Sequence, residues 1–426
     1  MNVQIDQQRL QSEIDELGQI TEGQPPVVTR VVFSAADLRA RAWLWRKCKE
    51  ANLAIRTDAV GNMFARWQGG DSRAPAVGTG SHIDAIPNAG KYDGVVGVLG
   101  GLEAIRALQR TGYRPSHSIE LLIFTSEEPT RFGVGCLGSR LLSGTLPPEC
   151  AAQLADDNGN SLETLRHAAK FSGDLISVKL PTGYYKAFVE LHIEQGPILE
   201  QSKIPLGIVQ KIAAPTSAKI LVEGVGGHAG GVLMAERADA LCAASELVLA
   251  VESAARETCA SDTVGTVGIC EVFPGAVNSI PSRVRLSLDV RDTDLARRDS
   301  VMQKIAGAAK AIASRRAVSI RTDLLNADIP ADCSRLVTQA LADSCRVHHL
   351  QFLSMFSRAY HDSLFMCHIT PTAMLFIPCH NGWSHRPDEY ASSEDIARGA
   401  LILAETLASL SMSTAACMVE PPQTSS

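Results

Sequence analysis

One stretch of the sequence, residues 81–94, brings together side chains that are suited to binding a metal ion. It contains His82, Asp84 and Asp93, and Asp93 is followed directly by Gly94. A metal site needs a neutral imidazole, an anionic oxygen and an outer carboxylate that holds the imidazole in place. A histidine at the end of a strand can equally be a structural residue, so this stretch alone leaves both interpretations open.

Ligand-type side chains occur in three further segments of the chain. They are Glu127 or Glu128, His192 and His385. A set that combines imidazoles with carboxylates and contains no cysteine suits Zn, Mn, Co or Ni, and it argues against a structural zinc site. The sequence therefore predicts a metal site that is built from separate segments.

The adjacent pair Glu127 and Glu128 indicates catalysis as well as metal binding. One carboxylate can bind the metal while the other takes a proton from a bound water and later passes it to a leaving nitrogen. The alternative is a solvated acidic loop. We favour the catalytic interpretation because the pair directly follows the apolar run 121–124.

Apolar segments precede most of these residues and predict how they are positioned. Residues 74–79, 118–124 and 188–192 are typical of buried strands, and residues 95–108 have the periodicity of a helix. In open α/β sheets, sites form beyond the carboxyl ends of the strands. We therefore expect the candidate ligands to meet at one edge of such a sheet.

A second pattern begins after Pro215. Strand-like and helix-like segments follow in the order β-α-β-β-α-β, which is typical of a ferredoxin-like domain. The sequence thus predicts a two-domain α/β protein, with helices flanking a mixed sheet in the catalytic domain. We expect the catalytic domain at residues 1–212 and 328–426 and an inserted lid or dimerisation domain at 213–327. Residues 413–426 are predicted to be a loose polar tail.

Composition excludes several other classes of protein. The 426 residues carry a net charge of −6 without a basic block, so a nucleic-acid partner is not expected. No apolar run is long enough for a transmembrane helix, and the N-terminal segment is too polar for a secretory signal. The eleven cysteines contain no CxxC pair, which favours reduced thiols. We therefore expect a cytoplasmic enzyme that has no membrane partner.

The motifs together resemble one family, the M20-type dinuclear metallohydrolases, and within it the amidase/carbamoylase branch. The resemblance runs from about residue 28 to residue 410. It rests on motifs in family order: Gly80-Ser81-His82-Ile83-Asp84, Lys91-Tyr92-Asp93-Gly94, Ser126-Glu127-Glu128, 190–197, Gly227-His228-Ala229-Gly230 and Ser384-His385. Peptidase members generally carry a carboxylate where this chain has His192, so the resemblance favours the amidase branch.

The resemblance implies two divalent ions, with Mn favoured and Zn, Co or Ni as alternatives. Asp93 would bridge the ions, with His82 and His192 on one and Glu128 and His385 on the other. Glu127 would be the general base, and Asp84 would orient His82 or simply cap a turn.

The resemblance also implies which residues bind the substrate: Gln195, His228, Asn278 and Arg291. His228 would come from the partner subunit of a homodimer and polarise the scissile carbonyl, whereas Arg291 offers a planar fork that fits a carboxylate. Without the resemblance, Arg291 would be interpreted as a surface residue at the end of a strand.

The segment 357–366 narrows the substrate class. Tyr360 and His361 stand in it, and a tyrosine at this position resembles ureidoglycolate amidohydrolases of the plant type. A phenol that hydrogen-bonds a substrate hydroxyl would discriminate strongly against analogues without it. The resemblance thus implies hydrolysis of the ureido C–N bond of ureidoglycolate. An N-carbamoyl-L-amino-acid or allantoate hydrolase remains an alternative, and a non-catalytic binding protein on the same fold is a distant one.

Overall fold

The computed structural model describes residues 2–412 and divides them into two compact units. The first unit holds residues 2–209, 333–354 and 365–412, and the second holds residues 210–332 and 355–364. The predicted tail, 413–426, lies outside the described residues. No helix in the described part of the chain is both long and apolar enough to cross a membrane.

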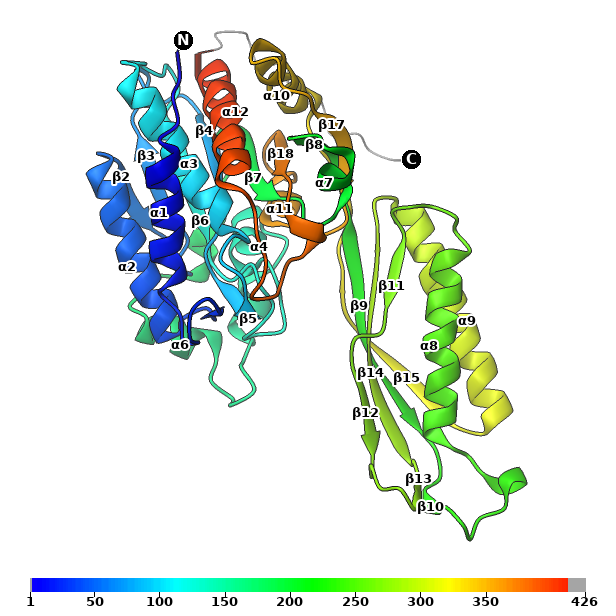
Figure 1. Cartoon of the computed structure of the whole chain (residues 1–426). Helices are drawn as coiled ribbons and strands as arrows, with labels where there is room; N and C mark the ends of the chain where they lie inside the picture. The colour runs from blue at the N-terminus through cyan, green and yellow to red at the C-terminus, as the bar shows by residue number, and fades with distance from the viewer. Residues whose placement is uncertain (1, 413–426) are drawn as a thin grey trace. The chain divides into compact units, whose positions relative to one another are not determined.

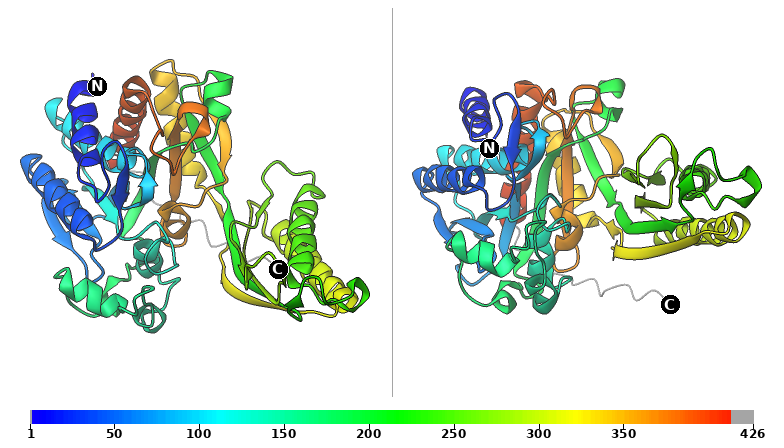
Figure 2. Two further views of the ribbon diagram at one scale, coloured as in Figure 1. Left: turned by 60° about the horizontal axis from the view of Figure 1, so that its bottom comes forward. Right: turned by 90° about the horizontal axis from the view of Figure 1, so that it is seen from below.

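A mixed sheet forms the centre of the first unit (Figures 1 and 2). Its strands follow the order β8-β18-β7-β4-β6-β3-β2. Their bounds are β2 Ala54–Thr57, β3 Met63–Trp67, β4 Ala76–His82, β6 Ile119–Phe124, β7 Tyr185–Ile193, β8 Gly207–Ile212 and β18 Thr372–Ile377. The four neighbouring strands β18, β7, β4 and β6 are parallel, so their carboxyl ends lie at the same edge of the sheet.

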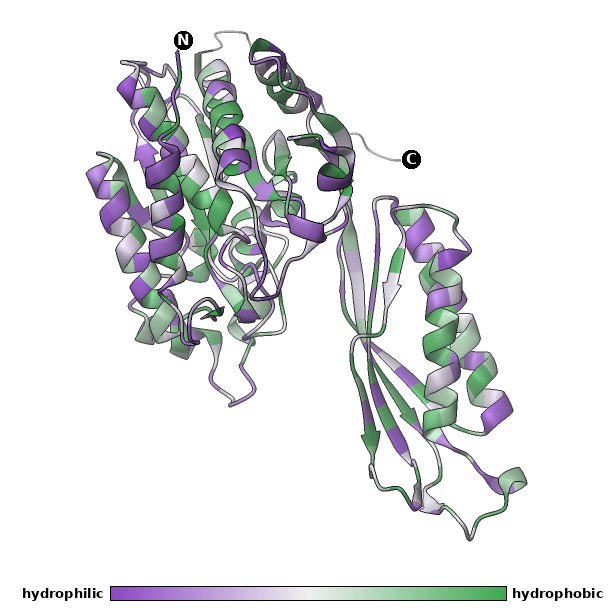
Figure 3. Cartoon of the chain, viewed as in Figure 1, coloured by the Kyte–Doolittle hydropathy of each residue, from purple (hydrophilic) through white to green (hydrophobic). Residues whose placement is uncertain are grey.

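Helices cover one face of this sheet. They are α1 (Gln7–Gly18), α3 (Val95–Arg110), α10 (Arg335–Val347) and α12 (Ser393–Met412). On α3 every residue from Val95 to Leu108 is buried, in keeping with its small and apolar sequence. By contrast, the ribbons of α1 and α2 (Ala35–Glu50) carry many hydrophilic residues among the apolar ones (Figure 3).

The opposite face is covered by a core of apolar side chains from the segment 132–180. This segment contains three short helices, with α5 starting at Pro148 as the Pro147-Pro148 pair would suggest. Strands β16 Ala331–Asp332 and β17 Leu353–Ser357 both pair with β8 in the mixed sheet. The other short helices and strands are α4 Leu137–Ser143, α5 Pro148–Ala152, α6 Leu162–Ala168, α7 Ile198–Ser202, α11 Asp362–Met366, β1 Val28–Arg30 and β5 Ala85–Ala89.

The second unit is an antiparallel sheet with two helices packed on one face. Its main strands follow the order β11-β14-β9-β15, and α8 and α9 pack on them through one apolar core. The bounds are β9 Ala214–Glu223, β10 Gly227–His228, α8 Ala240–Arg256, β11 Val264–Thr266, β12 Cys270–Phe273, β13 Ser279–Ile280, β14 Arg283–Asp292, α9 Leu295–Arg316 and β15 Ser319–Ala327. The predicted α/β fold class with a ferredoxin-like second domain is confirmed.

The second unit also takes in a short segment that sequence patterns did not assign to it. Residues 355–364 belong to this unit. Ser357 accepts a hydrogen bond from the Ala213 amide, and Arg358 binds the carbonyl oxygen of Ser261 and the carboxylate of Asp262. These contacts join residues that are far apart in the sequence, so local sequence patterns could not have predicted them.

Candidate metal centre

His82 is the last residue of β4, and its ring is held in one orientation. The ring is 2% exposed, and its Nδ1 lies 3.0 Å from the carbonyl oxygen of Asp84. A proton on Nδ1 satisfies that carbonyl and leaves the lone pair of Nε2 pointing away from it. The tautomer suits a metal ligand, because ligating histidines use their other ring nitrogen to bond an oxygen in this way.

Asp93 lies on the turn that leads into α3, and the next residue has to be glycine. Gly94 has a φ of +65°, and a Cβ atom there would lie 2.5 Å from the ring of His82. The glycine therefore lets the Asp93 turn approach the end of β4 closely.

His192 near the end of β7 is oriented in the same manner as His82. Its Nδ1 lies 2.9 Å from the carbonyl oxygen of Ile193, and its Nε2 accepts the Gly94 amide at 3.2 Å. The ring is fully buried. In their neutral form, both buried imidazoles thus present an unprotonated Nε2 toward Asp93.

Two donor groups meet at Asp93. In the first, Asp93 Oδ1 lies 3.5 Å from His82 Nε2 and 3.2 Å from His192 Nε2. In the second, His385 Nε2 lies 3.2 Å from both Asp93 Oδ2 and Glu128 Oε1. Within each group the donor atoms lie within 4.8 Å of one another. The structure therefore brings together all five side chains that the sequence proposes as ligands.

The charges of this cluster are not balanced by basic side chains. Neither Asp93 nor Glu128 is paired with a lysine or arginine in the described part of the chain, although both are buried. Buried carboxylates require compensation, which here falls on the imidazoles. Hydrogen bonds to Asp93 and Glu128 raise the pKa of His385 to about 11. For His82, burial opposes protonation, but the charges of nearby carboxylates outweigh it and raise its pKa well above the ordinary value.

The donor set fits divalent metal ions. It offers imidazole nitrogens and carboxylate oxygens with fixed outer partners, and it has a surplus of buried negative charge that cations would neutralise. His82, Asp93 and His192 would hold one ion, and Asp93, Glu128 and His385 would hold a second.

Glu127 lies next to this cluster. One carboxylate oxygen is 3.7 Å from His82 Nε2, and the other accepts a hydrogen bond from the thiol of Cys136 at 3.5 Å. The amides of Glu127 and Glu128 both donate to the carboxylate of Asp84, at 3.2 and 3.1 Å. Asp84 therefore orients His82 through its carbonyl oxygen, and its carboxylate fixes the loop that carries the two glutamates.

Gln195 also lies in the first unit, and its amide contacts the candidate ligand Asp93. Its Nε2 donates to Asp93 Oδ2 at 2.8 Å and to Ser384 Oγ at 3.1 Å. Sequence reasoning missed Glu389, whose carboxylate accepts hydrogen bonds from the Asp93 amide at 3.1 Å and from Ser384 Oγ at 2.8 Å. The only signal for it was its place four residues after His385, on the same loop.

Four non-glycine residues in or beside the cluster have left-handed backbone conformations. Ser126, Cys136, Gln195 and His385 all have left-handed φ angles, between 54° and 60°. Such conformations cost about 1–3 kcal/mol each in non-glycine residues and cluster at functional sites, where the surrounding structure fixes them. These four conformations therefore hold the segments that carry Glu127, Glu128 and His385 in fixed local geometries.

The other candidate substrate residues lie on the second unit, in two groups. His228 and Asn278 are exposed neighbours, since the Ala229 amide donates to the Asn278 carbonyl oxygen at 2.8 Å. Arg291 lies near the opposite end of β14, with its guanidinium 5.5 Å from the ring centre of Tyr360. His361 is buried, and its Nε2 lies 3.1 Å from Ser357 Oγ.

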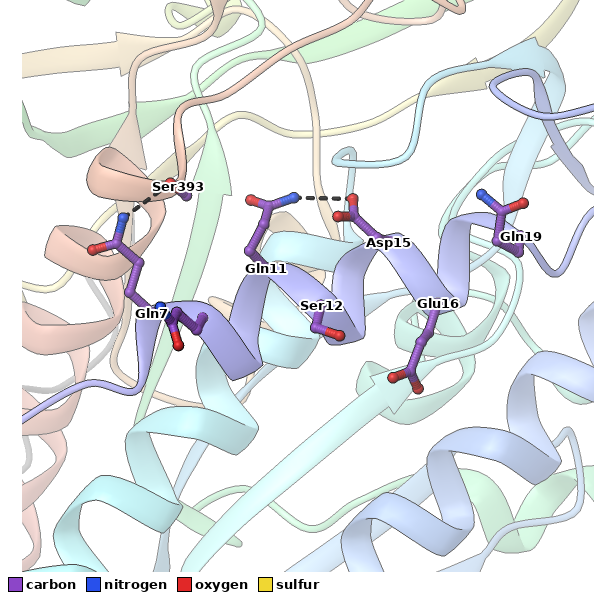
Figure 4. Close-up of a pocket in the computed structure, with 8 residues that line it drawn as sticks. Gln7, Gln11, Ser12, Asp15, Glu16, Gln19 and Ser393 are labelled. Carbon is purple, nitrogen blue, oxygen red and sulfur yellow. Dashed lines mark hydrogen bonds between the residues drawn. The ribbon is translucent and has the colours of Figure 1, made fainter.

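A cavity of about 770 Å³ lies along α1, but none of its lining residues is a candidate ligand. Figure 4 shows a polar lining in which Gln11 donates to Asp15 and Gln7 donates to Ser393. These side chains bond one another on the surface of the helix, so we assign this cavity no catalytic role.

Comparison with known proteins places this geometry in a family. Residues 78–409 match the model of peptidase family M20/M25/M40. The chain belongs to this family. The matched range includes every candidate ligand.

Relatives of this M20 chain include enzymes of known activity. It is 49% identical to ureidoglycolate hydrolase from Arabidopsis thaliana, over 96% of this chain and 88% of that protein. It is 38% identical to N-carbamoyl-L-amino acid amidohydrolase from Geobacillus stearothermophilus, over 95% of this chain and 98% of that protein. The crystal structure of AtUAH in complex with (S)-hydroxyglycine superimposes with a TM-score of 0.90 at 49% identity, covering 96% of this chain and 98% of that one.

Proposed function

We propose that this M20 chain is a metal-dependent amidohydrolase that cleaves the ureido C–N bond of ureidoglycolate. The observation that carries the proposal is the pair of donor groups that share Asp93 beside Glu127. The choice of ureidoglycolate as the substrate rests on the 49% identity to a ureidoglycolate hydrolase over nearly the whole chain. The products would be carbamate, which decays to ammonia and carbon dioxide, and hydroxyglycine, which decays to glyoxylate and ammonia.

The metal centre would consist of two divalent ions, with manganese favoured. The donors are nitrogen and oxygen atoms without a thiolate, which suits manganese as well as zinc, cobalt or nickel. When bound, such ions acidify a coordinated water and polarise the carbonyl group under attack. The ten cysteines in the described part of the chain are all free thiols, which supports a reducing compartment such as the cytoplasm.

Glu127 is the general base of the proposed reaction. Its carboxylate is 8% exposed and lies beside His82. It would accept a proton from the attacking water and return it to the leaving ureido nitrogen. The Cys136 thiol and the Asp84 carboxylate keep Glu127 in place, the first through its side chain and the second through its main chain.

His228 would stabilise the oxyanion that forms at the ureido carbonyl. Its Nδ1 accepts the Gly230 amide at 3.2 Å, so the neutral ring carries its proton on Nε2. The ring is exposed, and its N–H is suited to donating to a developing negative charge.

His228 and Arg291 cannot serve the same small substrate from one chain. His228 pairs with Ser279, beyond the Arg283 end of β14, whereas Arg291 lies near the other end of that strand (Figure 1). The strand from Arg283 to Arg291 alone spans about 27 Å, at roughly 3.4 Å per residue. If both residues contact the substrate, each site takes His228 from a second copy, so we propose a homodimer.

Arg291 would bind the substrate carboxylate, and the phenol of Tyr360 would form a hydrogen bond with the substrate hydroxyl group. The carboxylate of Asp289 accepts hydrogen bonds from the guanidinium, at 2.7 Å from Nε and 3.4 Å from Nη2, and the guanidinium lies against the Tyr360 ring. Held in this way, the group presents a preorganised planar fork to an anionic partner. The phenol offers the hydrogen bond that distinguishes ureidoglycolate from N-carbamoyl amino acids without a hydroxyl.

The nearest alternative is an N-carbamoyl-L-amino-acid or allantoate hydrolase, since relatives of both kinds match most of the chain. A substrate panel decides between them. The chelated protein is reloaded with Mn²⁺, and ammonia release is measured with ureidoglycolate, allantoate and several N-carbamoyl amino acids. We expect ureidoglycolate to be preferred by wild type, and Tyr360→Gly to lower its kcat/KM at least about 10-fold. A wild-type preference for another substrate, with Tyr360→Gly unchanged on it, would establish the alternative.

A further inference from the structure

Glu389 is a buried carboxylate that bonds two of the segments carrying candidate ligands. Its side chain is accessible to solvent by only 5%. Oε1 accepts the amides of Tyr92 and Asp93, at 2.9 and 3.1 Å, and Oε2 accepts the hydroxyl of Ser384 at 2.8 Å. The residue therefore joins the Asp93 turn to the loop that carries His385.

The packing around Glu389 leaves it little freedom. A Cβ atom at Gly90 would lie 2.5 Å from the Cβ of Glu389, so the two main chains approach closely at this point. Ser384 Oγ also lies 3.0 Å from Asp93 Oδ2, which places the hydroxyl between the two carboxylates. Glu389 thus acts on the main chain of Asp93 directly and on its carboxylate through Ser384.

Burying this carboxylate is costly, and its contacts with the protein do not explain the cost. It has no lysine or arginine partner among residues 2–412, and it lies close to the negative charge of Asp93. A buried carboxylate that serves only to close a loop could be replaced by an amide at less cost. Cations bound at Asp93 would supply the compensation that the protein does not provide.

We propose that Glu389 is a positioning residue for both metal ions. It fixes the distance between Asp93, which both donor groups share, and His385, which belongs to the second. Its own oxygens are occupied by three donors, so it acts as an outer partner and not as a ligand. The inference rests on the metal centre of the proposed function and is independent of which substrate is hydrolysed.

The test is calorimetric titration of Mn²⁺ into chelated protein, without substrate. Loss of an outer partner typically weakens metal affinity about 10- to 100-fold. We expect Glu389→Ala to weaken Mn²⁺ binding to this extent, and Glu389→Gln to weaken it less, because its amide oxygen still accepts the Tyr92 and Asp93 amides. Asp388→Asn is the matched control: this exposed neighbour bonds Arg386, and its variant should bind Mn²⁺ within about twofold of wild type.

The melting temperature of each metal-free variant is measured alongside to separate positioning from folding. Should Glu389→Ala fail to fold, Ser384→Ala removes the contact to Oε2 and is expected to weaken binding as well. The inference is overturned if folded Glu389→Ala binds Mn²⁺ within about twofold of wild type, or if Asp388→Asn loses as much affinity. Tight Mn²⁺ binding by wild type without turnover of any panel substrate would instead refute the proposed function and leave this inference standing.

Discussion

The candidate metal centre and the substrate-type residues of the second unit are built in opposite ways. At the centre, His82 and His192 are buried and their second ring nitrogens bond main-chain oxygens. On the second unit, His228 and Asn278 are exposed at one end of the sheet, and Arg291 lies near the other. One chain thus assembles a complete donor set, whereas its substrate-type residues are spread over a distance that no small substrate spans.

The two sheets explain this difference. Parallel strands bring residues from distant parts of the sequence to one edge, which is where β4, β6, β7 and β18 deliver their ligand-type side chains. A single long antiparallel strand such as β14 separates the residues at its two ends instead. The five candidate ligands thus all lie on the first unit, whereas the proposed use of the second unit requires two copies of the chain.

The largest effect is expected from Glu127→Gln, which tests the proposed general base beside the candidate metal centre. The amide cannot accept the proton of the attacking water, and general acid–base groups typically contribute about 10²- to 10⁴-fold to the rate. We expect kcat to fall by that amount while metal content, measured by plasma mass spectrometry, stays at the wild-type level. Wild-type turnover in the metal-loaded variant would show that Glu127 is not the base.

The paired second unit can be tested with heterodimers purified through two different affinity tags. A dimer of one His228→Ala chain and one Glu127→Ala chain should have one intact site and about half of the wild-type activity, although each homodimer is nearly inactive. The control joins a wild-type chain to a chain with both substitutions, which should be nearly inactive. If only the control is active, His228 serves its own chain and the paired arrangement is wrong.

A smaller effect is expected on the pH dependence of Mn²⁺ affinity, because histidines of the metal-free centre bind protons. The pKa of His385 is raised to about 11, chiefly by hydrogen bonds to Asp93 and Glu128, and the pKa of His192 is also raised, because its interactions with Asp93 outweigh burial. At pH 7 the His385 ring carries a proton that a metal ion must displace, so Mn²⁺ affinity should weaken as the pH falls. Titrations of Mn²⁺ at pH 7 in buffers of different ionisation enthalpy should show proton release. Binding enthalpies that do not depend on the buffer would contradict this description of the centre.

The sequence predicted much of the fold and singled out the five side chains that the structure brings together, for reasons that the structure explains. The apolar strand segments and the helix 95–108 follow local periodicity, and His82 ends one such strand while Asp93 lies just before the helix. The Tyr360 segment could not be assigned, because it joins the second unit through non-local bonds from Ser357 and Arg358. Glu389 was missed for the same reason.

Metal stoichiometry tests the central claim most directly. Chelated wild-type protein and Asp93→Ala are loaded with Mn²⁺, passed through a desalting column and analysed by plasma mass spectrometry. Because both donor groups share Asp93, we predict about two ions per wild-type chain and the loss of both in the variant. If Asp93→Ala retains the full wild-type metal content, the ions are bound elsewhere and the account is wrong.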